Sequence, residues 1–352
     1  MYRGPDSSHN PAMRKLIEAL CDDACAGRAT GSPGGERARR LVTEALRAAG
    51  LDPALQPIPA CNGANVLATV EGDIDRYVLV AAHYDHLGQR GASIYRGADD
   101  NAAAVAVLIE VARSLAQRRP SGRGVILAAF DAEEPPHFMS GTMGSQFFVR
   151  SPGAALARID QMICMDLVGH ALGPPQAPSE VRDSLFVLGA ERSLGTPALV
   201  DGVSRAVPGL VARRLDAEVI PPLSDYLPFW QARVPFLFLT GGRSRHYHTP
   251  EDTPDRLCYP KIEATAAWLE ALVRRCCERD DDCRFIQRRD DASTLSTAAA
   301  LCEALRDVTP EAELGRALAL ELLASCDADR RLPDDRRDRA LMLLATLEAR
   351  LS

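Results

Sequence analysis

The sequence predicts an α/β fold in which a mixed, largely parallel β-sheet is sandwiched between helices, with a C-terminal all-helical extension. From about residue 65 to residue 280, short apolar runs alternate with segments of helical periodicity. This alternation is expected for strands that are buried on both faces and joined by helical crossovers. After residue 283 the apolar runs stop and only helical periodicity continues. We therefore expect one domain over residues 1–283 and a helical extension over residues 284–352.

Each element follows from a local pattern. Residues 11–50 predict two helices that are separated by the breaker segment GRATGSPGG. Apolar runs predict strands at 65–70, 76–82, 123–130, 159–165, 184–190 and 234–240. Helices are expected between them near 101–118, 194–206, 225–232 and 260–279. The extension predicts helices near 292–307, 310–326 and 334–351.

Composition excludes several classes of function. Hydrophobic residues at 46% and charged residues at 25% are typical of a globular protein with a sizeable core. A net charge of −7 argues against a nucleic-acid partner, and no apolar run is long enough to span a membrane. The N-terminal segment lacks the apolar centre of a signal peptide, which predicts a cytoplasmic protein, or a periplasmic or secreted one if the chain is a trimmed form. The ten cysteines lack C-x-x-C spacing, which favours reduced thiols, with one or two disulfides left open for an exported protein.

Acidic residues and histidines follow four of the expected strands. They are His83, Asp85, Asp131, Glu133, Glu134, Asp166, His246 and His248. Ligands bind beyond the carboxyl ends of the strands in open α/β sheets, so these side chains are expected at one rim. Clustered carboxylates would repel one another and lose solvation unless a cation neutralised them. Imidazole and carboxylate ligands together favour zinc, with cobalt or manganese as substitutes.

The local geometry of the chain suggests different roles for some of these residues. Residues two apart on an extended strand share a face, so Asp85 can orient the imidazole of His83. The adjacent Glu133 and Glu134 point in different directions, so one can bind metal while the other stays free to transfer protons. The pair of aspartates in RGADDNAAAV precedes an apolar helix, where a single aspartate is an ordinary helix cap.

Five segments, AHYDHLG, GADDNAA, AEE, CMDLVGH and YHTPEDT, occur in this order on these elements and resemble the motifs of the M28 family of zinc aminopeptidases. With GRATGSPGG, the likeness extends over roughly residues 12 to 279, so the expected catalytic domain is residues 1–283. The resemblance implies two zinc ions per chain that share a hydroxide. The implied reaction is hydrolysis of the N-terminal peptide bond of peptides with a free N-terminus.

The resemblance also implies a role for each residue. His83 and Asp166 would bind one zinc ion. Glu134 and His248 would bind the other, and Asp99 would bridge the two. In relatives the peptide bond after the bridging aspartate can be cis.

Two further residues complete the expected catalytic set. They are Glu133, as the general base, and Tyr226, at a position that departs from the family pattern. By the same resemblance Glu133 takes the proton from the attacking water and returns it to the leaving amine. Tyr226 stands in SDYLPF where a histidine is common. Two roles are open for it, a donor to the developing oxyanion or a side chain that lines the pocket. The segment PPHFMSGTM, which contains Phe138 and Met139, is longer than the usual link and could form a wall of the specificity pocket.

Other interpretations remain open from the sequence. One is a glutaminyl-cyclase-like aminoacyltransferase with a single zinc ion. Another is a carboxypeptidase, although that branch usually carries an extra domain inserted between the first strands and this sequence leaves no room for one. A non-catalytic interaction protein on a peptidase scaffold is a third. His86, His170 and His246 are expected to orient ligands or to face solvent. The extension could form a homo-oligomer contact, a lid or a stabilising buttress.

Overall fold

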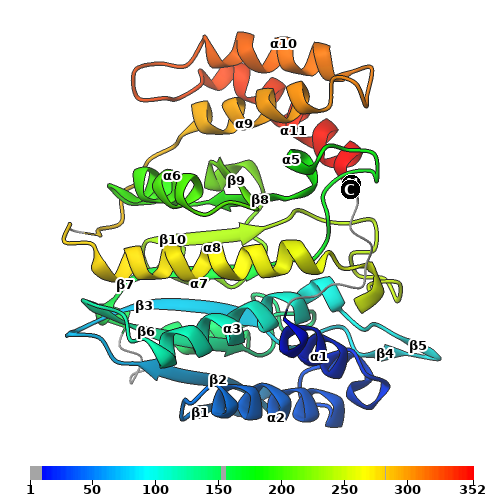
Figure 1. The fold of residues 1–352 in the computed structure, drawn as a ribbon, viewed down its shortest axis with the longest axis vertical. Helices are drawn as coiled ribbons and strands as arrows, with labels where there is room; N and C mark the ends of the chain where they lie inside the picture. Colours follow the sequence, from blue (N-terminus) through cyan, green and yellow to red (C-terminus); the bar gives the residue numbers. More distant parts are fainter. Residues whose placement is uncertain (1–9, 152–155, 282) are drawn as a thin grey trace.

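The computed structural model describes residues 10–151, 156–281 and 283–352, and it confirms the α/β fold. Within these ranges an eight-stranded mixed sheet has the order β1-β2-β6-β3-β7-β10-β8-β9 (Figure 1). The strands are β1 (Ala54–Ile58), β2 (Gly63–Val70), β3 (Ile74–His83), β6 (Arg123–Phe130), β7 (Ile159–Asp166), β8 (Ser184–Leu188), β9 (Val211–Leu215) and β10 (Phe236–Thr240). A separate hairpin is formed by β4 (Gln89–Arg90) and β5 (Ser93–Ile94).

The central strands β6, β3, β7 and β10 are parallel neighbours, so their carboxyl ends meet at one edge of the sheet. The strands β1 and β9 are the two edges, and the sequence pattern did not predict them. Their sequences, ALQPI and VARRL, lack a continuous apolar run. This is expected because β9 is only half-buried and most of β1 is exposed or half-buried.

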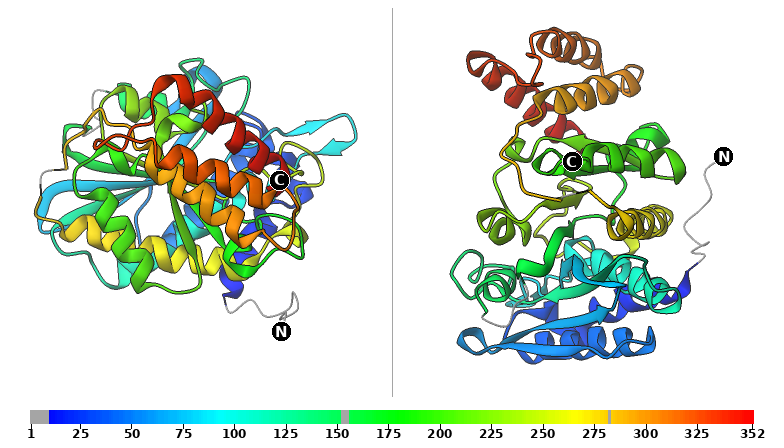
Figure 2. Two further views of the ribbon diagram at one scale, coloured as in Figure 1. Left: turned by 90° about the horizontal axis from the view of Figure 1, so that it is seen from above. Right: turned by 90° about the vertical axis from the view of Figure 1, so that its left-hand side faces the viewer.

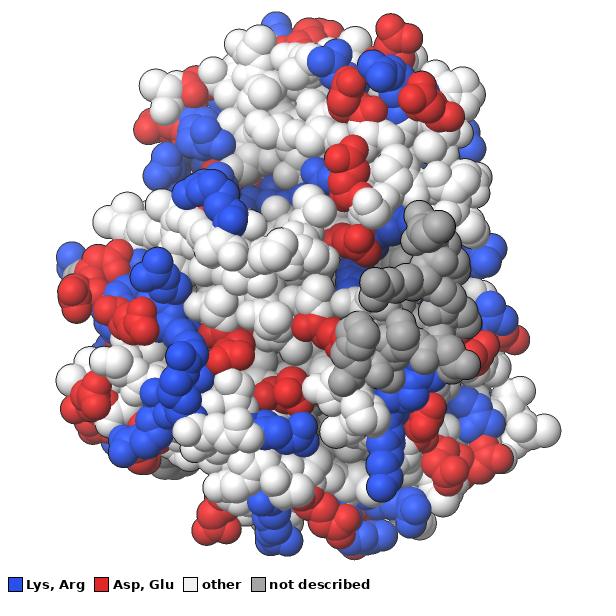
Figure 3. Space-filling view, in the orientation of Figure 1, with Lys and Arg blue, Asp and Glu red and all other residues white. Residues whose placement is uncertain are grey.

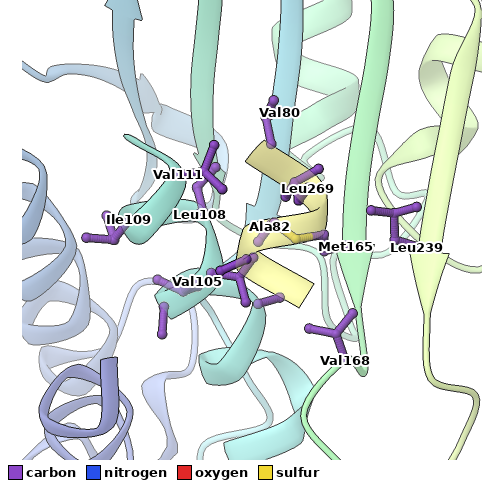
Figure 4. Close-up of a cluster of buried hydrophobic side chains, with 14 of the residues drawn as sticks. Val80, Ala82, Val105, Leu108, Ile109, Val111, Met165, Val168, Leu239 and Leu269 are labelled. Atoms are coloured by element: carbon purple, nitrogen blue, oxygen red, sulfur yellow. The ribbon is translucent and has the colours of Figure 1, made fainter. Parts of the chain in front are cut away.

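Helices cover both faces of the sheet, and the last three of the described helices stack beyond its β8–β9 end. The helices are α1 (Pro11–Leu20), α2 (Pro33–Ala48), α3 (Ala103–Gln117), α4 (Gly144–Arg150), α5 (Ser179–Arg182), α6 (Thr196–Ala206), α7 (Tyr226–Gln231), α8 (Tyr259–Glu278), α9 (Asp291–Ala304), α10 (Ala312–Leu323) and α11 (Asp334–Leu351). On one face Val80 and Ala82 of β3 pack with α3 and α8, as Figure 4 shows. On the other face Leu79 and Ala81 pack with the aromatic residues of α4 and α7. This alternation along β3 explains why the strand has an uninterrupted apolar sequence.

The helices α9, α10 and α11 stack beyond the β8–β9 end of the sheet, at the top of Figure 1 and of the right-hand view of Figure 2. Buried polar contacts attach α9 to the end of β9. The Thr294 hydroxyl accepts a hydrogen bond from the Asp216 amide at 2.8 Å, and the Thr297 hydroxyl donates to the Arg214 carbonyl at 2.9 Å. The C-terminal extension therefore packs against β9, the strand at one edge of the sheet.

The described residues include all ten cysteines, and none of these forms a disulfide. Among the described helices, none combines the length and the apolar character that a membrane-spanning helix needs. On the face shown in Figure 3, acidic and basic side chains are interspersed.

Candidate metal centre

Four parallel strands deliver the expected site residues to one edge of the sheet. His83 and Asp166 are the last residues of β3 and β7, and Glu133 and Glu134 follow β6. His248 lies in the loop after β10. The first four are at least 91% buried, and His248 is half-buried. The structure therefore brings these five side chains together, as the rim argument predicts.

One group of donor atoms surrounds His83. Its Nε2 atom lies 3.3 Å from Asp100 Oδ1 and 3.5 Å from Asp166 Oδ1. Among the described residues, neither ring nitrogen of His83 nor Asp166 Oδ1 has a hydrogen-bond partner, although all three atoms are buried. Buried polar atoms are rarely left without partners in native proteins. Imidazole and carboxylate donors that are held this close together fit a divalent cation such as zinc.

A second group surrounds Glu134. His248 Nε2 lies 3.1 Å from Asp100 Oδ2 and 3.2 Å from Glu134 Oε2. His86 Nδ1 lies 2.7 Å from Glu134 Oε1. The donors of His86, Asp100 and Glu134 lie close enough together to hold a second ion. The sequence analysis did not count His86 as a ligand, because a single histidine beside a motif carries no distinguishing signal.

The structure corrects the expected bridge, since Asp100 and not Asp99 lies between the two groups. Asp100 presents Oδ1 to His83 and Oδ2 to His248. The Asp99 carboxylate is turned away, accepting hydrogen bonds from the amides of Gly169 at 2.6 Å and His170 at 3.1 Å. Asp99 Oδ2 also faces His170 Nδ1 at 2.7 Å.

The physical reason for this error is local backbone geometry. Neighbouring side chains in an irregular turn point in different directions, and the sequence pair Asp-Asp does not reveal which one points inward. Asp100 has non-helical angles, φ −111° and ψ 82°, inside the turn Ala98–Ala102 that precedes α3. Within this turn, the cis peptide bond follows Asp100, not Asp99.

Three residues outside the expected site hold the turn that presents Asp100. Asp252 accepts hydrogen bonds from the backbone amides of Asp99 at 2.8 Å and Asp100 at 3.1 Å. The buried Arg28 guanidinium donates to the Gly97 carbonyl at 2.9 Å. Gly97 has φ +57°, and a Cβ atom there would come within 2.6 Å of the His86 ring. The only sequence signal for Asp252 and Arg28 was their place within YHTPEDT and GRATGSPGG.

Asp85 connects two strand ends. Its carboxylate oxygens accept hydrogen bonds from the amides of Glu133 and Glu134, each at 3.1 Å. Asp85 Oδ1 also lies 3.6 Å from His83 Nδ1, on the face that the strand spacing predicts. One carboxylate therefore holds the backbone of both glutamates and lies beside the imidazole of His83.

The charges of the centre are strongly interdependent. Burial raises the pKa of Glu133 well above its usual value, and the carboxylates of Asp166 and Glu134 add to this. Burial opposes ionisation of Asp100 too, but the nearby imidazoles of His248 and His83 outweigh it and hold its pKa well below the usual value. Burial would lower the pKa of His248, yet Asp100 and Glu134 raise it to about 10. Buried carboxylates this close together are stable in their charged form only beside positive charge, which a bound cation would supply in place of protons.

A further buried carboxylate, which the sequence analysis did not single out, lies close by. Asp225 is 1% exposed, and burial raises its pKa to about 7, with contributions from the charges of Asp85 and Asp166. Its charge in turn raises the pKa of Glu133. Asp225 therefore belongs to the electrostatic surroundings of the candidate base.

The next residue, Tyr226, begins α7 and is completely buried. Its ring stacks on Phe236 and Phe238, with centroids 5.1 and 4.7 Å away. The ring therefore packs in the core and does not line the cavity that adjoins Asp166, and the role of oxyanion donor stays a prediction. Phe138 and Met139, expected in a wall of the specificity pocket, do not line the cavity that adjoins Asp166.

Several known proteins are similar to this chain. The family model described as Peptidase family M28 matches residues 65–273, which is more than half of the chain. The uncharacterised protein YfbL of Escherichia coli is 29% identical over 254 residues, which cover 64% of this chain and 76% of YfbL. The glutaminyl-peptide cyclotransferase of Boiga irregularis is 26% identical over 239 residues, covering 59% of this chain and 64% of the cyclotransferase.

Among solved structures, the LapA aminopeptidase of Legionella pneumophila has a similar fold, with a TM-score of 0.64. The match covers 80% of this chain and 79% of LapA at 13% sequence identity. At this identity the likeness concerns the fold alone.

Proposed function

Because the chain belongs to Peptidase family M28, we propose that it is a zinc-dependent aminopeptidase that uses two metal ions to hydrolyse the N-terminal peptide bond of peptides. The observation that carries this proposal is the position of Asp100. Its two carboxylate oxygens face two separate groups of donors, one around His83 and one around His248. A carboxylate that is shared in this way is suited to two ions held side by side.

The ligand assignment follows from the two groups. His83 and Asp166 would hold one ion together with Asp100. Glu134 and His248 would hold the other, and His86 is placed either to complete this group or to orient Glu134. When bound, two such ions polarise a scissile carbonyl and lower the pKa of a water molecule.

Glu133 is the proposed proton carrier. Its Oε2 atom lies 3.9 Å from His83 Nε2, at the edge of the first donor group, and Glu133 contributes to neither donor set. Burial raises its pKa above the usual carboxylate value, which is the direction that makes a carboxylate a better proton acceptor. Glu133 would accept a proton from the attacking water and return it to the leaving amine. The hydrogen bond between its amide and Asp85 would keep it in place.

A second candidate is a glutaminyl-cyclase-like aminoacyl transfer at a single zinc ion. The 26% identity to the Boiga irregularis cyclotransferase over 239 residues favours it, because the match covers 59% of this chain. The presence of both donor groups favours the two-metal reaction instead.

The test uses the full chain loaded with zinc and two kinds of substrate. We expect release of 4-nitroaniline from aminoacyl 4-nitroanilides and no cyclisation of peptides that begin with glutamine. The Glu133→Gln variant is the control for contaminating peptidases. Cyclisation without anilide hydrolysis would replace the proposal with the second candidate, and the absence of both reactions would reject both.

A further inference from the structure

An apolar cavity of about 380 Å³ adjoins the candidate metal centre. Asp166, Thr240 and Tyr247 lie in its lining, so one end of the cavity reaches the donor groups. The Tyr247 ring stacks on the His248 ring, with centroids 3.8 Å apart. A ligand that occupied this cavity would therefore have one end beside the metal centre.

The far wall of the cavity comes from the C-terminal extension. The sheet side is apolar and includes Phe186 and Leu188 of β8 and Phe238 of β10. Opposite it, helices α9 and α11 contribute Thr297, Ala298, Leu301, Leu341, Leu344 and Leu347. These six residues lie outside residues 65–273, the part that matches the family model. The wall is therefore a feature of this chain that the family match does not describe.

Two contacts attach α11 to the loops that surround the centre. The Leu351 carbonyl accepts a hydrogen bond from the Gly173 amide at 2.8 Å. At the rim of the cavity, Arg243 Nη2 and Nε lie 2.7 and 2.9 Å from Glu348 Oε1. Arg243 belongs to the loop that leads to His248, so α11 is tied to the segment that delivers a candidate ligand.

The size and chemistry of the cavity define its occupant. A dry apolar cavity of about 150 Å³ is large enough to bind benzene. The cavity here is more than twice as large, and most of the residues that line it are apolar. Pockets with apolar walls and a few polar groups at one end bind ligands whose polar part is fixed and whose apolar part is enclosed.

We propose that α9 and α11 complete the specificity pocket of the enzyme and select substrates whose N-terminal residue has a large aromatic or long aliphatic side chain. This inference rests on the proposed aminopeptidase function. The amino group and the scissile carbonyl of such a substrate would lie at the metal centre, and its side chain would extend towards Leu301 and Leu344. The extension is then part of the substrate site.

The test fills the cavity from α11. Ala345 lines the cavity and is exposed, so Ala345→Trp adds volume without disturbing the core. Ala349 is also exposed on α11 but does not line the cavity, so Ala349→Trp is the matched control. Hydrolysis of the 4-nitroanilides of L-alanine, L-leucine and L-phenylalanine is measured with the zinc-loaded full chain.

We expect the unsubstituted protein to have a kcat/KM for the phenylalanine substrate at least about tenfold higher than for the alanine substrate. Ala345→Trp should lower the phenylalanine value by about tenfold or more, and the alanine value by no more than about twofold. Ala349→Trp should change neither. Equal effects of Ala345→Trp on both substrates, or no preference in the unsubstituted protein, would overturn the proposal.

A second variant tests the opposite change. Leu341→Ala enlarges the cavity, and Met342→Ala, at a neighbouring residue that is 71% exposed, is its control. The enlarged pocket should shift the preference towards side chains longer than leucine, measured with 2-aminooctanoyl 4-nitroanilide against the leucine substrate. A shift of the same size in Met342→Ala would contradict the assignment.

A binding measurement separates failure of this inference from failure of the proposed function. L-Phenylalanine and L-alanine are titrated calorimetrically into the same proteins, which requires no turnover. Tighter binding of phenylalanine that Ala345→Trp removes would support the pocket even if no anilide is hydrolysed. Equal binding of the two amino acids would overturn it, whatever the activity.

Discussion

The polar centre at the sheet edge and the apolar cavity beneath α9 and α11 lie next to each other but are built in opposite ways. In the centre, buried carboxylates hold the backbone segments that present the donor groups, as Asp252 and Asp85 do. In the cavity, apolar side chains from distant parts of the chain enclose space, with few directional contacts. We therefore expect substitutions in the centre to abolish the reaction, and substitutions in the cavity to change which substrate is used.

The two adjacent aspartates provide the largest expected contrast within the centre. Asp100→Asn removes the carboxylate that both donor groups share, so both ions should be lost or severely weakened and activity should disappear. Asp99→Asn keeps that carboxylate and disturbs only its support, so metal affinity should fall by about 10- to 100-fold. Metal content after dialysis against a weak chelator measures the difference. A greater loss for Asp99→Asn would restore Asp99 as the bridge.

Glu133→Gln separates metal binding from proton transfer. We expect kcat to fall by about 10²- to 10⁴-fold, because the proton acceptor is lost, while the metal content stays at the level of the unsubstituted protein. Steady-state kinetics and metal analysis on the same preparation check both statements. A variant that retains near-normal kcat would remove Glu133 from the mechanism.

Asp252→Asn tests whether the support of the turn matters as much as its geometry suggests. The asparagine amide cannot accept hydrogen bonds from both the Asp99 and Asp100 amides, so metal affinity should fall by about tenfold or more. Asp255→Asn is the matched control, because this exposed carboxylate lies three residues away and is outside the donor groups. Similar losses in the two variants would indicate a general effect of charge.

Tyr226→Phe should have the smallest effect. The ring packing is preserved and the buried hydroxyl is not needed for it, so kcat should stay within about threefold and the free energy of unfolding within about 1 kcal/mol. Kinetics and denaturant unfolding of this variant measure both quantities. A fall in kcat of about a hundredfold with unchanged stability would instead identify Tyr226 as an oxyanion donor.

The polar centre was easier to predict from the sequence than the apolar cavity. Parallel strands that end at His83 and Asp166 or lead into Glu134 leave a pattern of apolar runs followed by polar residues, so the convergence of these three residues was predictable. The choice between Asp99 and Asp100 depends on the angles of one irregular turn, which composition and spacing do not encode. The cavity depends on Leu301 and Leu344 meeting a sheet that is more than fifty residues away in sequence, and leucines at helical spacing do not reveal what they face.

The central claim is that two metal ions share Asp100, and the number of zinc ions bound per chain tests it most directly. Protein purified without chelator is saturated with zinc, dialysed and analysed by elemental mass spectrometry, with Asp100→Asn measured in parallel. The account predicts two equivalents, both required for anilide hydrolysis, and a strong loss in Asp100→Asn. A single equivalent at saturation, unchanged in Asp100→Asn, would contradict it.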